Sequence, residues 1–410
     1  MIPNRKLIKM KKLVLLVAGL AVSLTSCQTE NTDVTAPADY TFLRDGGNTA
    51  FMGGQTDRLA MGGELGSSLK DFTKSATDLQ EMFANEDASG NNVDPYTSAA
   101  LNASSKSVRS KTAASVAYFS SNASSSAAIK SDFDNWISSQ VSEVFSTKDS
   151  AAAPGKSGQI ADGSSARYVN SMGLEYDQVI LKGLIGAFVT DQILNNYLDP
   201  LTLDAGSNVD DNDNVLLETD KNYTTMEHKW DEGYGYLFGG ADDKVNPMST
   251  LGTDDSFLNK YLGKVVADTD FSDKGDIIFN AFKLGRAAIV AGNYEVRDAQ
   301  VAIIRETISE VIGIRAVKYL EAGKDALAAE DWGGAFHDLS EGYGFVYSLQ
   351  FTRNPESGAP YFSESEVDGF LSDMMSDGSN GLWDLQSTTL STISSDIAAR
   401  FDFTVLQVTN

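Results

Sequence analysis

Cysteine and histidine are almost absent from this chain of 410 residues. Its one cysteine, Cys27, cannot form an intramolecular disulfide or a cysteine-based metal site. The two histidines, His228 and His337, leave little room for a catalytic triad, and neither a G-x-S-x-G elbow nor an H-E-x-x-H motif occurs. The sequence therefore does not indicate an enzyme of these classes.

Positive charge is scarce as well. The chain has 32 Lys and Arg residues against 57 Asp and Glu residues, which gives a formal net charge of −25 at pH 7. Binding to nucleic acid requires clustered cations that neutralise phosphates, so we expect no nucleic-acid partner. An acidic surface keeps a protein soluble and attracts cations and basic ligands.

The N-terminus has the features of an export signal. Five basic residues within positions 5–12 precede an apolar run, Leu13 to Leu24, that is too short to span a bilayer. This order is typical of a signal peptide, here residues 1–26. The run ends Leu24-Thr25-Ser26-Cys27, which resembles a bacterial lipobox and implies cleavage before Cys27 and lipidation of Cys27. An ordinary secretory signal with a free cysteine is the alternative.

The remaining chain is predicted to be helical. Residues 27–38 would form the lipidated cysteine and a flexible tether, and residues 39–410 a helical domain. Glycine-rich residues 46–63, the low-complexity stretch 148–166 and the polar stretch 204–214 are predicted to be irregular, and no segment indicates a sheet. Apolar spacing of 3.6 residues predicts helices over 64–84, 98–145, 167–198, 224–239, 255–266, 275–292, 294–323, 331–349, 364–375 and 387–401.

One motif occurs twice. Residues 228–236 and residues 337–345 both have the pattern H-x-x-x-E-G-Y-G-aromatic, and each copy opens with one of the two histidines. Thr224 and Asp331 are predicted N-caps of the two motif helices. Each copy follows a long apolar helix, so we predict an all-α bundle with an internally duplicated helical hairpin, over about residues 167–240 and 294–350.

Two interpretations of the motif remain open. Residues one turn apart share a helix face, so His228 and Glu232, like His337 and Glu341, could be ligands of a transition metal. The two pairs would then form one four-ligand site at the bundle axis or two half-sites. Alternatively, the motif is a packing element, in which each glutamate orients its histidine or caps a neighbouring helix and the glycines permit close helix crossing.

Three segments resemble a known family. They are Tyr40-Thr-Phe, residues 54–59 and residues 227–236, and they are similar to the bacterial lipoprotein family named domain of unknown function 4856, which implies no activity. The chain also resembles the imelysin-like proteins, which are exported, helical, internally duplicated and associated with iron uptake. Their G-x-H-x-x-E motif is not matched, because Met226 and Ala335 replace the glycine and Asp231 and Ser340 replace the acid. The resemblance implies an architecture and not a peptidase activity.

These observations lead to a hypothesis of function. The chain is expected to be an outer-membrane lipoprotein of the cell envelope, facing either the periplasm or the surface, because Gln28 rather than Asp follows Cys27. It would bind a metal ion or metal complex, with iron or another divalent transition metal as the cofactor and a metal-uptake receptor as a partner. The alternatives are a non-catalytic structural or interaction lipoprotein without a metal site, and a metal-dependent hydrolase.

Overall fold

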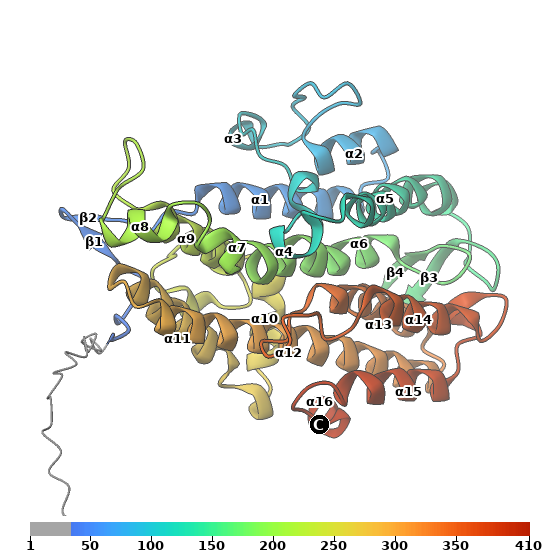
Figure 1. Ribbon diagram of the computed structural model, residues 1–410. Coiled ribbons are helices and arrows are strands. Elements are labelled where there is room, and N and C mark those ends of the chain that lie inside the picture. The colour runs from blue at the N-terminus through green and yellow to red at the C-terminus, as the bar shows by residue number, and fades with distance from the viewer. Residues whose placement is uncertain (1–33) are drawn as a thin grey trace, which may run out of the picture. The chain divides into compact units, whose positions relative to one another are not determined.

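Helices make up most of residues 34–410, the part of the chain that the computed structural model describes (Figure 1). The predicted signal peptide, Cys27 and the tether up to residue 33 lie outside these described residues. Tether residues 34–38 have neither helix nor strand, as the sequence predicts. No helix in the described part is long and apolar enough to cross a membrane.

The first part of the fold is a short hairpin followed by helices. It contains β1 (Leu43–Arg44), β2 (Gly47–Asn48), α1 (Gly53–Ser68), α2 (Ala76–Ala84), α3 (Ala99–Asn102), α4 (Val116–Phe119) and α5 (Ala123–Ser139). A π-helical segment, Gln140–Val144, continues α5.

The middle part contains a second hairpin and the first motif helix. Its elements are β3 (Gly158–Asp162), β4 (Ser165–Val169), α6 (Tyr176–Leu184), α7 (Pro200–Leu203), α8 (Asn208–Asp213), α9 (Thr225–Phe238) and α10 (Leu258–Val266). Two π-helical segments, Ile185–Thr190 and Ile193–Tyr197, follow α6.

The last part contains the longest helix, α12. Its elements are α11 (Lys274–Val290), α12 (Tyr294–Ala328), α13 (Trp332–Ser348), α14 (Glu364–Ser376), α15 (Ser387–Ala398) and α16 (Val405–Thr409). The 35-residue α12 contacts α11, α13, α15 and α16, and its buried residues lie on every side. A helix covered in this way belongs to the core, which explains why its apolar residues show no single stripe.

The helical fold class is confirmed, and several boundaries are corrected. The predicted helix 64–84 is two helices, because Ser75 starts α2 with a capping box. Strand β4 replaces the start of the predicted helix 167–198, and β3 pairs with it antiparallel inside a stretch that was predicted to be irregular. The polar stretch 204–214 contains the short helix α8.

The start of α1 also differs from the prediction. This helix begins within the glycine-rich segment, at Gly53, and contains four further glycines that pack at close range or face open space. A Cβ on Gly62 would lie 2.5 Å from the Phe257 ring, and one on Gly66 would lie 2.9 Å from Leu181. Tertiary packing therefore outweighs the low helix propensity of glycine here.

The turn after α8 stores backbone strain. Val215 has φ of 51°, and it sits where helix C-terminal motifs normally place glycine, since its N–H bonds Asn212 O and the Leu216 N–H bonds Asp211 O. A β-branched side chain is unfavourable in this left-handed conformation. Val215 is also 53% exposed, so burial of its side chain does not offset the strain.

Replacing Val215 by glycine should therefore stabilise the protein. We expect Val215→Gly to raise the free energy of unfolding by about 1 kcal/mol, measured by chemical denaturation. Leu216→Gly is the matched control, because Leu216 is exposed in the same turn without a positive φ. Equal effects of the two substitutions would show that Val215 is not strained.

Candidate functional site

The first motif copy lies on α9, where the sequence predicts it. Thr224 starts the helix with the predicted capping box: its hydroxyl accepts from the Glu227 N–H, and its N–H donates to the Glu227 carboxylate. His228 and Glu232 share one face, with His228 Nε2 4.0 Å from Glu232 Oε2. This distance is longer than a hydrogen bond, so the histidine is not held by its glutamate.

Aromatic rings hold His228 instead. The imidazole stacks on Tyr223, with ring centroids 4.7 Å apart, and lies 5.8 Å from the Phe51 ring. Its Nδ1 is buried and has no hydrogen-bond partner among the described residues. Burial lowers the pKa of His228, so the ring is neutral at pH 7.

Glu232 is engaged by two neighbours. Gln55 of α1 donates to Oε1 at 3.0 Å, and Lys229 donates to Oε2 at 2.9 Å. Burial opposes ionisation of Glu232, but the charge of Lys229 and the two hydrogen bonds together lower its pKa. Glu232 is therefore an ionised carboxylate that links α9 to α1.

The second copy lies on α13, within a buried network. Asp331 is the N-cap, as predicted, and accepts from the Gly334 N–H. His337 Nδ1 lies 2.9 Å from Glu175 Oε2, whereas its Nε2 is 3.9 Å from Glu341. Glu341 forms an ion pair with Lys182 of α6 at 2.8 Å.

The two copies pack in matching ways. In each copy the glycine after the glutamate lies against a Tyr-Leu pair of a neighbouring helix, and the next motif glycine lies against the residue that bonds the glutamate. These contacts are Gly233 with Tyr197 and Leu198, Gly342 with Tyr319 and Leu320, Gly235 with Gln55, and Gly344 with Lys182. The internal duplication itself remains a prediction from the sequence.

The four predicted ligands do not come together. His228 and Glu232 face α1, while His337 and Glu341 face α6. Within residues 34–410, no three His, Cys, Asp or Glu side chains are placed to hold a metal ion. The shared four-ligand site is therefore not formed by the described residues, because each pair is engaged by a different helix.

The first copy does border a cavity of about 550 Å³, which we call the α1–α9 cavity. It is lined by the start of α1, the face of α9 that bears the motif, and residues from the segment before α4. The lining residues are Phe51, Gly53, Gly54, Gln55, Asp57, Arg58, Lys106, Lys111, Tyr197, His228, Lys229 and Glu232. Its size is in the range of small-molecule binding sites.

Cations dominate this cavity. Four of its lining residues are Lys or Arg, and two are acidic. Arg58, Lys106 and Lys111 form no ion pair with any carboxylate of residues 34–410. Arg58 is only 7% exposed, and its Nε and Nη1 donate to the carbonyls of Ser107 and Gly54.

Two backbone donors at the cavity are also unoccupied. The N–H groups of Gly53 and Gly54 at the start of α1 donate to no acceptor among the described residues, and Met52 provides no side-chain cap. Burial lowers the pKa of Lys111, and the positive charges of Arg58, Lys229 and Lys106 lower it further, against the opposing charge of Glu232. Like charges therefore repel one another here, and a bound anion would relieve that repulsion.

The comparison with protein families gives one match. The family model described as Domain of unknown function (DUF4856) matches residues 37–404. The chain belongs to this family. No curated protein and no solved structure matches the chain.

Sequence reasoning found His228 and Glu232 but missed the cations beside them. Arg58 lies in one of the segments that carry the family resemblance. Because the function of that family is unknown, the resemblance assigns Arg58 no role. Lys106, Arg109 and Lys111 place three cations within six residues of an otherwise acidic chain. That local reversal of charge is the signal that could have found the cavity.

The close helix contact at the motif glycines can be tested directly. A Cβ on Gly344 would lie 2.5 Å from Lys182 Cβ, so we expect Gly344→Ala to lower the free energy of unfolding by about 1–3 kcal/mol. Gly369→Ala in α14 is the control, because nothing lies within 4 Å, and it should stabilise by about 0.5–1 kcal/mol. Chemical denaturation measures both, and a neutral Gly344→Ala would contradict the close packing.

The buried pair Glu341–Lys182 predicts a pH dependence. Burial opposes ionisation, but the ammonium of Lys182 lowers the pKa of Glu341 to about 2, below its ordinary 4.5. Ionised Glu341 thus contributes about 3 kcal/mol of stability above pH 4.5, and this contribution is lost as the pH falls toward 2.

Glu341→Gln should remove that contribution. At pH 7 the free energy of unfolding of the variant should be several kcal/mol lower than that of the wild type, because Lys182 is left buried and unpaired. The difference from the wild type should shrink below pH 4.5, as followed by denaturation at a series of pH values. The exposed Glu356→Gln is the control, and a pH-independent difference would contradict the ionised pair.

Proposed function

We propose that the protein is a binding protein that holds a small anionic molecule in the α1–α9 cavity. The observation that carries this proposal is the group of Arg58, Lys106 and Lys111, three cations without a carboxylate partner at one cavity. In a chain with 25 more acidic than basic residues, a cation normally finds a carboxylate nearby. Hydrogen bonds from charged donors to an anionic group are about twice as strong as neutral ones.

The cavity supplies the other elements of an anion site. Free N–H groups at the start of α1 point to the same end of the helix, where the helix dipole favours negative charge. Tyr197 lies beneath two of the ammonium groups, with Lys111 Nζ 5.3 Å and Lys229 Nζ 5.8 Å from its ring centroid. This ring holds the lysines in place by cation–π attraction.

The same charges bear on the metal hypothesis. A bare divalent cation would be repelled by the four cations of the cavity. A metal complex with net negative charge, such as a ferric chelate of carboxylate ligands, would be attracted to the cations of the cavity as other anions are. Iron acquisition thus stays within the proposal as the binding of an anionic metal complex.

The cellular setting of the proposal comes from the sequence. The basic segment, the apolar run and the lipobox-like residues before Cys27 support an exported lipoprotein that is attached to the outer membrane through Cys27. A binding protein in this position would present its ligand to a membrane receptor.

Calorimetry with the full-length protein tests the proposal. Citrate, pyrophosphate and ferric citrate are each titrated into the protein at low ionic strength. We expect at least one of them to bind at one site per chain. The double variant Lys106→Ala/Lys111→Ala should weaken that binding about tenfold or more, because each substitution removes one charge-assisted hydrogen bond to the anion.

A matched control separates this effect from a general loss of charge. Lys156 is exposed and does not line the cavity, so Lys156→Ala should leave binding unchanged. Tighter binding of ferric citrate than of citrate would identify a metal complex as the ligand. Absence of binding for all three anions, or an equal loss in the control, would contradict the proposal.

A further inference from the structure

Large apolar side chains are exposed mainly at one end of the described fold. Ten such side chains are exposed among residues 34–410, and six of them belong to the β1–β2 hairpin, the residues just after it, the loop between α8 and α9, and the last residue of α11. We call this region the apolar end, and its six residues are Leu43, Phe51, Val215, Leu216, Leu217 and Val290. A single exposed apolar residue needs no explanation, but a group of them marks a contact surface.

Hydrogen bonds hold the segments of the apolar end together. Arg44 of β1 donates to the carbonyl of Asn222 at 2.6 Å, and the Asn222 amide donates to the carbonyl of Asn48 at 3.2 Å. The hairpin therefore contacts the α8–α9 loop. Asn212 of α8 donates to the carbonyl of Ile289 at 2.7 Å, which joins the start of this loop to the end of α11. Figure 1 shows β1, β2 and α8 at the same end of the helical domain.

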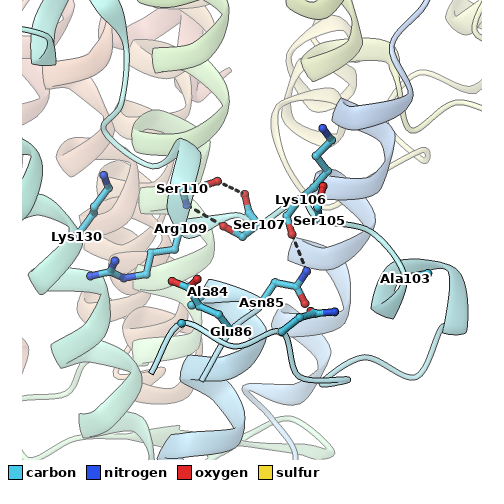
Figure 2. A pocket seen from close by; sticks show the side chains of 12 residues that line it. Ala84, Asn85, Glu86, Ala103, Ser105, Lys106, Ser107, Arg109, Ser110 and Lys130 are labelled. Atoms are coloured by element: carbon cyan, nitrogen blue, oxygen red, sulfur yellow. Dashed lines mark hydrogen bonds between the residues drawn. The ribbon is translucent and has the colours of Figure 1, made fainter. Parts of the chain in front are cut away.

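The neighbouring surface is polar. A cavity of about 530 Å³ beside α2 and α5 is lined by nine polar side chains and by no large apolar one (Figure 2). Its Arg109 is paired with Asp134 at 2.7 Å. Between Phe51 and Leu201, a range that the structure describes in full, no large apolar side chain is exposed. Exposure of apolar residues is thus a local property of the apolar end.

The α8–α9 loop has a strained backbone that packing within the fold does not explain. Val215 has φ of 51° and is half exposed, and it is followed by the exposed residues Leu216 and Leu217. Strained residues cluster at functional sites, where the surrounding structure maintains the strained geometry. In this loop the strained turn begins a run of three consecutive apolar residues that the fold leaves exposed.

The start of the described chain indicates what this end meets. Lys283 of α11 donates to the carbonyl of Ala38 at 3.1 Å, so the chain enters the domain beside α11. Seven residues lead from Cys27 to Val34, and they span at most about 25 Å. The 35-residue α12 is about 50 Å long, twice that reach. A lipid on Cys27 therefore keeps the bilayer near the end at which the chain enters.

We propose that the apolar end is a lipid-contacting surface, with Leu216 and Leu217 at the boundary between the headgroups and the acyl chains of the membrane that holds Cys27. This inference rests on the attachment through Cys27 that the proposed function includes, and it does not depend on the anion site. Glu218 and Asp220 follow the apolar run, so the contact is made by apolar side chains and not by attraction to anionic lipid.

This contact would also orient the anion site. Phe51 belongs to the apolar end and lines the α1–α9 cavity. Lipid contact at this end therefore places that cavity close to the membrane surface, where the proposed receptor is located.

A fluorescent label in the lipidated protein tests the contact. Lipidation consumes the thiol of Cys27, the only cysteine of the chain, so Leu216→Cys provides one reactive thiol. The thiol is labelled with nitrobenzoxadiazole, and the protein is placed in phosphatidylcholine vesicles with and without a nitroxide quencher on the lipid acyl chain. Emission of the label at position 216 should shift to shorter wavelength and should be lost when the quencher is present.

Leu406→Cys is the matched control. Leu406 is 68% exposed, against 61% for Leu216, and it lies on α16, where Lys318 donates to the carbonyl of Val408 at 3.0 Å. Lys318 is 24 residues after Tyr294, or about 36 Å along α12 from the end that bonds α8. A label at position 406 should show neither the shift nor the quenching.

Two further conditions identify the kind of contact. Quenching at position 216 should persist at high salt and should weaken when Leu217→Asp is added, because the contact is apolar. It should be smaller in vesicles rich in phosphatidylglycerol, because Glu218 and Asp220 are repelled by anionic lipid. Quenching that requires phosphatidylglycerol and disappears at high salt would contradict an apolar contact.

The remaining outcomes separate this inference from the proposed function. Lipid on Cys27, shown by mass spectrometry, without quenching at position 216 would overturn the inference. A shift without quenching that grows with the number of protein molecules per vesicle would assign the surface to a second copy of the chain instead. Absence of lipid on Cys27 would defeat both this inference and the membrane attachment. Binding of citrate, pyrophosphate or ferric citrate in the calorimetry would leave the anion site standing in each case.

Discussion

The close approach of each motif helix to its neighbour determines the geometry of the structure around it. Gly235 brings α9 so near to α1 that a Cβ would lie 2.6 Å from that of Met52, and Gly344 does the same for α13 on α6. At this distance Gln55 reaches Glu232 and Lys182 reaches Glu341. The walls of the α1–α9 cavity are thereby fixed, because Arg58 lies one turn further along α1 than Gly54 and Gln55.

The packing alternative for the motif agrees with the structure in part. The glycines permit the close helix crossing, as that alternative states. The glutamates neither hydrogen-bond their histidines nor cap a neighbouring helix, and instead bond the side chains of Gln55 and Lys182 on the adjoining helices. The two histidines differ: His228 is stacked between aromatic rings beside a cavity, and His337 is bonded to Glu175. A motif that is repeated for packing can therefore border a binding cavity in one copy and a buried ion network in the other.

Local signals in the sequence predicted the parts of the fold that depend on neighbouring residues. The caps Thr224 and Asp331, the presence of helices at α11 and α12, and the shared face of His228 and Glu232 all follow from residues within a few turns. The start of α1 was not predicted, because this helix depends on contacts with distant residues. Phe257 on Gly62 and Leu181 on Gly66 are such contacts. The β3–β4 hairpin, which packs on α13, was not predicted either.

The site was half predictable for the same reason. His228 and Glu232 could be paired from helix spacing alone, but the cavity needs cations from α1, from the segment before α4 and from α9. Nothing in the order of the residues shows that these three segments meet. Charge at positions 106–111 indicated an unusual segment, and only the fold shows that it faces α9.

The proposed function requires that an anion binds between Arg58, Lys106 and Lys111. The most direct measurement is a crystal structure of the protein soaked with selenate, whose selenium is located by its anomalous scattering. We expect the strongest selenium peak in the α1–α9 cavity, with selenate oxygens within hydrogen-bond distance of these three side chains. Selenium peaks elsewhere and none in this cavity, or a carboxylate of the protein itself occupying it, would contradict an anion site there.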